Sequence, residues 1–277
     1  MATFVLIHGG GDVGWYWHLV ERELGQRGHD TLAPDLPCDD DSAGLAEYAD
    51  TVVQAIGARR GLIVVAQSFG GFTAPLVAAQ VPVDMLVLVA GMVPAPGEAP
   101  SDWPANTGFD EVMRKQAQRY PDADLVYQDV PPALAGRARR KARDQSDTPG
   151  RAPWPLEAWP DVPTRFVLCT EDRFFPPEFM HRVVADRLGV VPDEIVAGHA
   201  VALSRPKELA NLLVSYSATG VGRLSRRAGE TTLREGCTAF SRVRSSPGRR
   251  QVPRLLARRS SSHLKEDGHG LTFHCPA

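Results

Sequence analysis

Three residues far apart in the chain have the types and the order needed for covalent acyl transfer. Ser68, Asp172 and His199 follow one another as serine, acid and histidine, the order found in α/β-hydrolases and different from that of the two main protease classes. A serine hydroxyl becomes a nucleophile when a histidine takes its proton, and a carboxylate orients that histidine. These residues predict a Ser-His-Asp catalytic triad if the fold brings them together.

The predicted nucleophile lies in the pentapeptide Ala66-Gln67-Ser68-Phe69-Gly70, between an apolar run and a helix-like segment. A sharp turn from a strand into a helix needs small residues two before and two after the serine, and Ala66 and Gly70 meet this need. Such a turn exposes the hydroxyl above the sheet and points the N–H groups of the helix start at a developing oxyanion. A Ser-Gly turn without any catalytic role is the alternative interpretation.

His199 is the predicted base because it follows the last predicted strand, in Gly198-His199-Ala200, where a loop at the carboxyl edge of a sheet would face the serine. A loop histidine without a role is the alternative. The other seven histidines lie in a glycine turn, near helices or a strand start, or close to the C-terminus: His8, His18, His29, His181, His263, His269 and His274.

Two neighbouring carboxylates compete for the role of the orienting acid. Glu171 and Asp172 both follow the fifth predicted strand. We favour Asp172, because a residue further beyond the strand end is better placed to turn toward the histidine. An exposed carboxylate balanced by Arg173 is the alternative.

An oxyanion hole needs two N–H donors. The backbone N–H of Phe69, directly after the serine, is one candidate, and the glycine turn His8-Gly9-Gly10-Gly11 after the first strand is the expected source of the other. The glycines could instead form a phosphate loop. That reading is weak, because the GxGxxG spacing and its acidic partner are both missing.

Apolar runs and amphipathic segments alternate along the chain. Strands are predicted over residues 3–7, 31–33, 62–65, 85–89, 165–169 and 193–196. Helices are predicted over residues 15–26, 45–56, through 75–80, over 177–188 and from about 206 to 216. This alternation predicts an α/β fold: a mostly parallel sheet of about six strands, with helices on both faces.

A long proline-rich segment, about residues 93–163, separates the fourth and fifth predicted strands and contains Trp103, Trp154 and Trp159. We call it the insertion. So long a connection inside a compact domain is usually functional, and we expect a lid over the site with one basic helix over residues 133–143. The tryptophans either line an apolar acyl pocket or pack the insertion onto the core.

The net charge of −2 hides two regions of opposite sign. Residues 1–216 carry 19 basic and 29 acidic side chains, a charge of −10, whereas residues 217–277 carry 12 and 4, a charge of +8. We therefore expect one hydrolase domain over 1–216. The remaining residues, rich in Arg, Ser and Gly, predict a basic tail that is disordered or extraneous to the enzyme.

Several classes of protein are excluded by the same composition. No apolar run reaches the ~20 residues of a membrane span, no secretory signal precedes the first strand, and the four cysteines are widely spaced. We expect a cytoplasmic protein with reduced thiols. It should act on a small molecule, without nucleic-acid or membrane partners; its oligomeric state is left open.

Neither candidate metal cluster has ligand spacing. Asp39-Asp40-Asp41 lacks a calcium-loop pattern and favours the dipole of the following helix instead. The C-terminal His263, His269, His274 and Cys275 do not match a zinc site. We expect neither a metal nor an organic cofactor.

Taken together, these motifs resemble the small α/β-hydrolases that include plant methyl esterases and hydroxynitrile lyases. The first predicted strand and its glycine turn, residues 4–9, and the aromatic start of the first helix, residues 14–17, are similar to those of that subgroup. The turn around Ser68, the acid Asp172 and the loop with His199 also fall where the subgroup places them. The resemblance covers about residues 3–216. It implies a sheet of about six strands that begins at the family's usual third strand, and Gly10 as the second oxyanion donor.

Two departures from the subgroup bear on the reaction. Ala200 stands where the lyases have a lysine that holds cyanide, which argues against lyase chemistry, and Gly10 stands where related esterases often have alanine. The resemblance and the triad predict a serine hydrolase for small, largely apolar esters. The alternatives are a hydrolase-like receptor for a small ligand, carbon–carbon bond hydrolysis or lysis on the same triad, and cofactor-independent oxygen chemistry.

Overall fold

The computed structural model describes residues 1–230, and for residues 219–230 it gives the helical backbone alone. The last helix, α10, spans Pro206–Glu230. Its predicted end near residue 216 is therefore wrong. Half of the residues from 217 to 230 are strong helix formers (Ala, Leu, Arg and Glu). The glycines among them stand singly, and each costs about 1 kcal/mol without ending the helix. The rest of the predicted basic tail, residues 231–277, lies outside the described residues.

Six parallel strands form one sheet in the order β2-β1-β3-β4-β5-β6. Their bounds are β1 Thr3–Ile7, β2 Asp30–Leu32, β3 Leu62–Gln67, β4 Met85–Val89, β5 Thr164–Cys169 and β6 Asp193–Ile195. Because every pair of neighbouring strands is parallel, the carboxyl ends of the six strands lie at one edge of the sheet. The predicted α/β architecture, a parallel sheet of six strands between helices, is confirmed.

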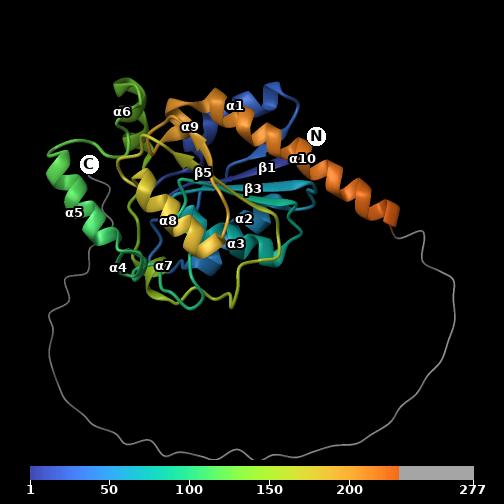
Figure 1. Ribbon diagram of the computed structural model, residues 1–277, viewed down its shortest axis with the longest axis horizontal. Helices are drawn as coiled ribbons and strands as arrows, with labels where there is room; N and C mark the ends of the chain where they lie inside the picture. Colours follow the sequence, from blue (N-terminus) through green and yellow to red (C-terminus); the bar gives the residue numbers. More distant parts are fainter. Residues whose placement is uncertain (231–277) are drawn as a thin grey trace, which may run out of the picture.

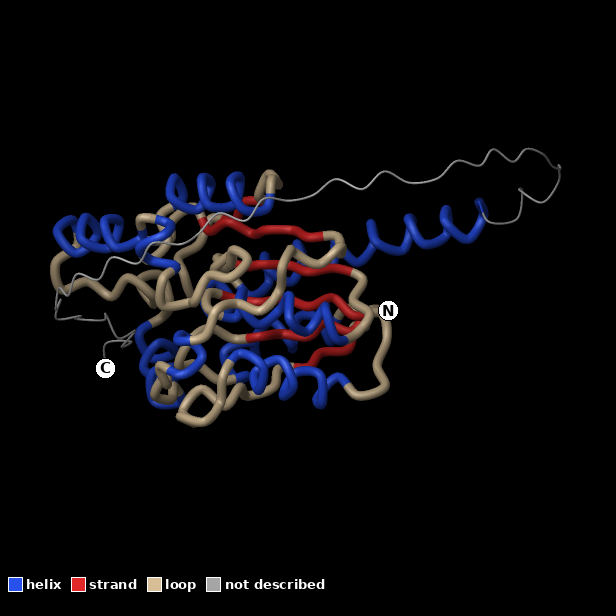
Figure 2. The backbone as a smooth tube through the Cα atoms, turned by 90° about the horizontal axis from the view of Figure 1, so that it is seen from below, coloured by secondary structure: helices blue, strands red, loops and turns tan. Residues whose placement is uncertain are grey.

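Helices cover both faces of the sheet (Figure 1; Figure 2). On one face lie α1 (His18–Gln26), α9 (Val201–Ser204) and α10, which pack against alternate strand residues such as Phe4 and Leu6. On the other lie α2 (Leu45–Ile56), α3 (Gly70–Gln80) and α8 (Pro177–Leu188), which pack against Val5 and Ile7.

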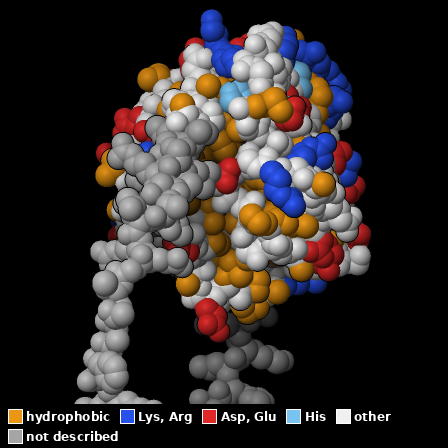
Figure 3. All heavy atoms as spheres, turned by 90° about the vertical axis from the view of Figure 1, so that its right-hand side faces the viewer, with side chains coloured by type: hydrophobic (Ala, Val, Ile, Leu, Met, Phe, Trp, Pro, Cys, Tyr) orange, Lys and Arg blue, Asp and Glu red, His pale blue; other side chains and the backbone are white. Residues whose placement is uncertain are grey.

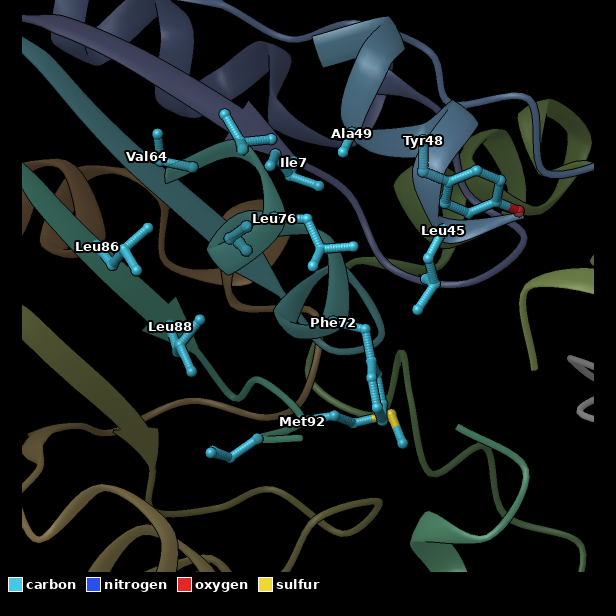
Figure 4. Packing of buried hydrophobic residues seen from close by; sticks show 14 of the residues in the cluster. Ile7, Leu45, Tyr48, Ala49, Val64, Phe72, Leu76, Leu86, Leu88 and Met92 are labelled. Atoms are coloured by element: carbon cyan, nitrogen blue, oxygen red, sulfur yellow. The ribbon is translucent and has the colours of Figure 1, made fainter. Parts of the chain in front are cut away.

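The hydrophobic cluster on the face covered by α2, α3 and α8 is drawn close up in Figure 4, where the ring of Phe72 of α3 lies beside Met92 and Leu88 projects from β4. The residues of the three strands β1, β3 and β4 are buried on both faces of the sheet, whereas β2, β6 and the start of β5 are partly exposed. Strands with two buried faces read as unbroken apolar runs, which is why the sequence shows them so clearly.

The helix predicted over 15–26 begins differently from expectation. A 3-10 turn, η1 (Gly14–Trp17), precedes α1. Gly14 packs against the loop after β2, where a Cβ would lie 2.0 Å from the carbonyl oxygen of Ala33. This close approach holds the first turn against the loop, so that the regular helix starts only at His18.

The insertion contributes α4 (Trp103–Thr107), α5 (Phe109–Arg119), α6 (Pro132–Lys141) and α7 (Thr148–Arg151). Two of its tryptophans are buried and fasten it to the core. The ring of Trp103 packs against Phe179 of α8, with centroids 5.8 Å apart, and Trp154 Nε1 donates to Phe72 O of α3 over 3.1 Å. These two residues therefore pack the insertion in place. They take the second of the two roles considered for the tryptophans.

Figure 3 shows the side of the molecule where the strands begin, opposite to the edge where their carboxyl ends lie. Apolar side chains gather in the middle of that face, among charged side chains of both signs. A shallow groove of about 240 Å³ lies at the start of β5, lined by Trp159, Val162, Thr164, Arg187, Leu188 and Val190. None of the predicted site residues lines it.

Candidate active site

Ser68 occupies the sharp turn between β3 and α3, with a backbone φ of +50°. A positive φ is unfavourable for a residue with a Cβ and persists where the surroundings hold it. Here the Ser68 carbonyl accepts N–H bonds from Gly71 over 3.0 Å and from Met92 over 2.9 Å. The turn therefore stores local strain at the residue predicted to be the nucleophile.

The glycine two residues after Ser68 is required by space. A Cβ added at Gly70 would lie 2.7 Å from the carbonyl oxygen of His8 and 3.0 Å from the side chain of Ile7. Backbone at such a distance cannot move aside cheaply. The predicted need for a small residue at this place therefore has a visible cause, the close approach of α3 to the end of β1.

Asp172 and His199 lie in contact although they come from different loops, after β5 and β6. His199 Nδ1 is 2.8 Å from Asp172 Oδ2, and their side chains are 4% and 1% exposed. The other carboxylate oxygen, Oδ1, accepts the N–H groups of Phe174 and Phe175, both over 2.8 Å. Because an ionised carboxylate can only accept, Nδ1 of His199 carries the proton and Nε2 has the free lone pair.

Glu171 does not reach the histidine. Its side chain is exposed, and its backbone N–H donates to Ala197 O over 3.0 Å, a bond that ties the two loops together. Of the two carboxylates that the sequence left open, the structure places Asp172 against His199.

Two phenylalanine rings pack on the imidazole. The ring centroids of Phe174 and Phe175 are 4.8 and 5.1 Å from that of His199. Their apolar surface covers the imidazole and shields the Asp172–His199 pair from water. No sequence pattern indicated this contact, because it depends on the turn that Asp172 itself stabilises.

Gln67, the last residue of β3, lies on the other side of the imidazole. Its Nε2 is 3.0 Å from His199 Nε2, and the side chain is buried. Within the described residues, Ser68 Oγ makes no hydrogen bond to His199. No role was predicted for Gln67 from the sequence. Its partner is 132 residues away, so no local signal could reveal it.

Gly10 and Phe69 face each other across the glycine turn. A Cβ added at Gly10 would lie 3.6 Å from Phe69 Cβ. Within the described part of the chain, neither backbone N–H donates to a protein acceptor. Both donors are therefore available to an external oxygen. The next residue, Gly11, has a φ of +64° and donates its N–H to Gln145 Oε1 over 2.9 Å.

His8 supports the glycine turn as a neutral imidazole with both ring nitrogens in hydrogen bonds. Burial lowers the pKa of His8 to about 4. Its Nε2 accepts the N–H of Leu36 over 3.0 Å, so Nδ1 carries the proton and donates to Gly9 O over 2.8 Å. With both nitrogens occupied, His8 is a structural residue and offers no base to a substrate.

The insertion contacts both sides of the site. On one side, Gly198 N–H donates to Asp129 Oδ2 over 2.8 Å and Ala200 N–H donates to Val126 O over 3.3 Å, so that His199 lies between two bonds to the insertion. On the other side, Arg143 N–H donates to Gly11 O over 2.8 Å. These contacts fit the predicted lid, and Asp129 and Gln145 are site residues that sequence reasoning missed.

The cysteines of the described region are poor nucleophiles. Cys38 and Cys169 are free and buried. Burial raises the pKa of Cys38 to about 11 and raises that of Cys169 well above its usual range. Both thiols therefore stay protonated at neutral pH.

Among residues 1–230, no group of three or more His, Cys, Asp and Glu side chains is arranged to hold a metal ion. The C-terminal histidines considered as zinc ligands lie outside this range. None of the helices in the described region is long and apolar enough to cross a membrane.

A parallel sheet whose strand–serine–helix turn, acid loop and histidine loop meet at one edge defines the α/β-hydrolase class. The profile of the alpha/beta hydrolase family matches residues 4–212, and the chain belongs to this family. The predicted resemblance is thereby confirmed.

Curated relatives are similar over nearly their whole length. The chain is 26% identical to norfluorocurarine synthase 1 of a Strychnos species, covering 76% of this chain and 93% of that protein. It is 23% identical to polyneuridine aldehyde esterase of Rauvolfia serpentina, covering 77% and 95%.

Solved structures share the fold. The crystal structure of polyneuridine aldehyde esterase superposes with a TM-score of 0.63 at 21% identity, covering 78% of this chain and 99% of that one. An extracellular α/β-hydrolase from a Paenibacillus species gives 0.64 at 23% identity, covering 78% and 98%.

Proposed function

We propose that this chain is a serine hydrolase that cleaves small, largely apolar esters or related acyl compounds through an acyl-enzyme on Ser68. Membership of the alpha/beta hydrolase family supports hydrolytic activity. The observation that carries the proposal is the buried 2.8 Å contact between Asp172 and His199 at the strand edge that holds Ser68. The named esterase among the relatives supports an ester as the substrate class.

In the acylation step, Ser68 Oγ attacks the ester carbonyl carbon while its proton passes to Nε2 of His199. The negative charge moves to the carbonyl oxygen, and the N–H groups of Gly10 and Phe69 stabilise it. Asp172 stabilises the imidazolium through Nδ1–H and does not itself take the proton. The tetrahedral intermediate collapses, the C–O bond breaks, and the alcohol leaves with the proton from Nε2.

In the second step, a water molecule gives a proton to Nε2 of His199 and attacks the acyl carbon. The acid is released and Ser68 recovers its proton. Each step uses protein groups and water, so the proposed mechanism needs no metal or organic cofactor.

The surroundings of the site support an apolar substrate. Phe174 and Phe175 cover His199, and Phe69 stands at the serine turn. Ala200, directly after the histidine, is buried and brings no cation to the site. This favours ester hydrolysis over lyase chemistry that needs a lysine there. A small-molecule substrate fits this arrangement, and a cytoplasmic location stays a prediction.

Hydrolysis of p-nitrophenyl acetate and labelling by a fluorophosphonate probe test the proposal. We expect the wild-type protein to turn over the ester and take up one probe at Ser68, and the Ser68→Ala variant to do neither. Equal rates in the two proteins would contradict the assignment. A panel of methyl and aryl esters beside a panel of aromatic ketones then separates ester cleavage from carbon–carbon bond cleavage.

A further inference from the structure

The Nε2 side of His199 has an occupant that the proposed reaction does not require. Gln67 Nε2 lies 3.0 Å from His199 Nε2 and 3.5 Å from the His199 carbonyl oxygen. The side chain is 4% exposed and directly precedes Ser68 in the chain. A buried amide thus contacts the ring nitrogen that the proposed reaction uses as the base.

The protonation pattern of the ring gives this contact its direction. Asp172 accepts the Nδ1 proton, so Nε2 offers one lone pair. The amide N–H of Gln67 donates to it. The hydroxyl of Ser68 needs the same lone pair to transfer its proton, and within residues 1–230 it makes no bond to the ring. The two donors therefore compete for one acceptor.

The side-chain amide of Gln67 packs against Gly9 of the glycine turn. A Cβ added at Gly9 would lie 2.5 Å from Gln67 Oε1 and 3.1 Å from Ser68 Cβ. The missing side chain at Gly9 leaves room for the carbonyl end of the amide, and the amide nitrogen then points at the imidazole. The position of Gln67 is thus set from β1, from β3 and from the histidine loop.

We propose that Gln67 is a positioning residue that occupies Nε2 of His199 in the free enzyme and has to yield that nitrogen to Ser68 before acylation. This inference rests on the proposed function. In the resting state the bond holds the ring in place. Entry of an acyl group at the serine displaces the amide, and the lone pair becomes free for the Ser68 proton.

Several groups face the imidazole besides Gln67. The carboxylate of Asp172 contacts Nδ1, the rings of Phe174 and Phe175 pack against the imidazole, and the carboxylate of Asp129 accepts the N–H of the preceding residue, Gly198. Of these, only Gln67 contacts Nε2. A change at Gln67 therefore acts on the protonation of Nε2 while the other contacts stay in place.

The first test measures the rate of fluorophosphonate labelling against pH. Gln67→Met keeps the length of the side chain but removes the N–H donor, and Gln67→Glu keeps its shape and adds a negative charge. A donor at Nε2 favours the neutral ring. We therefore expect the pH of half-maximal labelling to rise by about 0.5 to 1 unit in Gln67→Met and further in Gln67→Glu, with faster labelling of Gln67→Met on the high-pH plateau.

Gln80→Met, at the exposed end of α3, is the matched control and should follow the wild-type profile. An unchanged pH of half-maximal labelling in both Gln67 variants would overturn the inference, because loss of packing alone lowers the rate without moving the profile.

The second test needs no activity. We expect the ¹⁵N chemical shift of His199 Nε2 to be the same in the wild type and in Ser68→Ala, and to move toward the value of an unbonded lone pair in Gln67→Met. A shift that changes in Ser68→Ala and stays in Gln67→Met would make Ser68 the resting donor and overturn the inference. If the wild-type protein takes up no probe, the proposed function fails, while this spectrum still decides the role of Gln67.

Discussion

The carboxylate of Asp129 accepts a hydrogen bond from the backbone N–H of Gly198 over 2.8 Å, one residue before His199. A Cβ added at Gly198 would lie 2.5 Å from Asp129 Oδ1, so a glycine is needed for this contact. Asp129 Oδ1 is buried and has no hydrogen-bond partner within the described residues. The insertion thus holds the histidine loop through a hydrogen bond that the Gly198 N–H donates to one oxygen of the Asp129 carboxylate, while the other oxygen has no partner among the described residues.

Removal of this bond should slow the reaction more than it weakens substrate binding. In Asp129→Ala the loop loses its anchor, and we expect kcat for p-nitrophenyl acetate to fall roughly ten-fold or more with little change in KM. Asp129→Asn keeps an oxygen that can accept from Gly198 and should restore most of the activity. An Asn variant as slow as the Ala variant would show that the charge, rather than the bond, is needed.

Asp172 should be far more important than its neighbour. Asp172→Asn can still accept from Phe174 and Phe175 but no longer stabilises the imidazolium, and we expect kcat to fall by about 10³–10⁴. Glu171→Gln, on the exposed side of the same loop, is the matched control and should keep near-wild-type rates. Similar losses in both variants would refute the assignment of the acid. Steady-state ester hydrolysis is the measurement.

Gly70, in the turn two residues after Ser68, should not tolerate a larger side chain. Gly70→Ala forces a Cβ against the His8 carbonyl oxygen, and we expect a loss of about 1–3 kcal/mol in the free energy of unfolding together with slower probe labelling. Gly25→Ala, in α1 with no atom within 4 Å of the added Cβ, should instead stabilise by about 0.5–1 kcal/mol. Urea denaturation compares the two, and a stable, fully active Gly70→Ala variant would contradict this account of the turn.

Asp12, at the end of the glycine turn, should make stability depend on pH. Burial raises the pKa of Asp12 from 3.8 to about 7, partly offset by the N–H that Val13 donates to it over 2.8 Å. Between pH 4 and 7 the folded chain keeps this proton while the unfolded chain loses it. The free energy of unfolding contributed by Asp12 therefore falls as the pH rises through this range.

The variant Asp12→Asn keeps the acceptor for Val13 and never ionises. We expect it to match the wild type near pH 4 and to be more stable above pH 7, by up to about 4 kcal/mol. The neutral His8 is present in both proteins and cancels in the difference. Asp50→Asn, at the exposed surface of α2, controls for the loss of one charge. A difference between Asp12→Asn and wild type that grows toward low pH would contradict the assignment.

Removal of the C-terminal residues tests the prediction that the hydrolase domain ends near residue 216. All strands found among residues 1–230 and all predicted site residues precede residue 217, so we expect a chain that ends at residue 220 to keep its ester hydrolysis and probe labelling. Loss of active protein on this truncation would show that the C-terminal residues belong to the enzyme.

The sequence revealed the parts of the structure that depend on local pattern. Strands buried on both faces appear as apolar runs, and the strand–Ser68–helix turn has its own spacing of small residues, so the fold and the place of Ser68 could be predicted. Asp172 and His199 followed from their position after strands in a parallel sheet. By contrast, Gln67, Asp129 and Gln145 bind partners 132, 69 and 134 residues away. Their side chains carry no local signal, and only the folded chain brings them to the site.

The two bonds that the insertion makes on either side of His199 have a consequence for turnover. An outward movement of residues 126–129, wide enough to admit a substrate, breaks the bonds from Gly198 and Ala200. Without these two bonds, the loop that carries His199 has lost its contacts with residues 126–129. The two bonds therefore make the placement of the predicted base depend on the position of the insertion, so that residues 126–129 and His199 are positioned together.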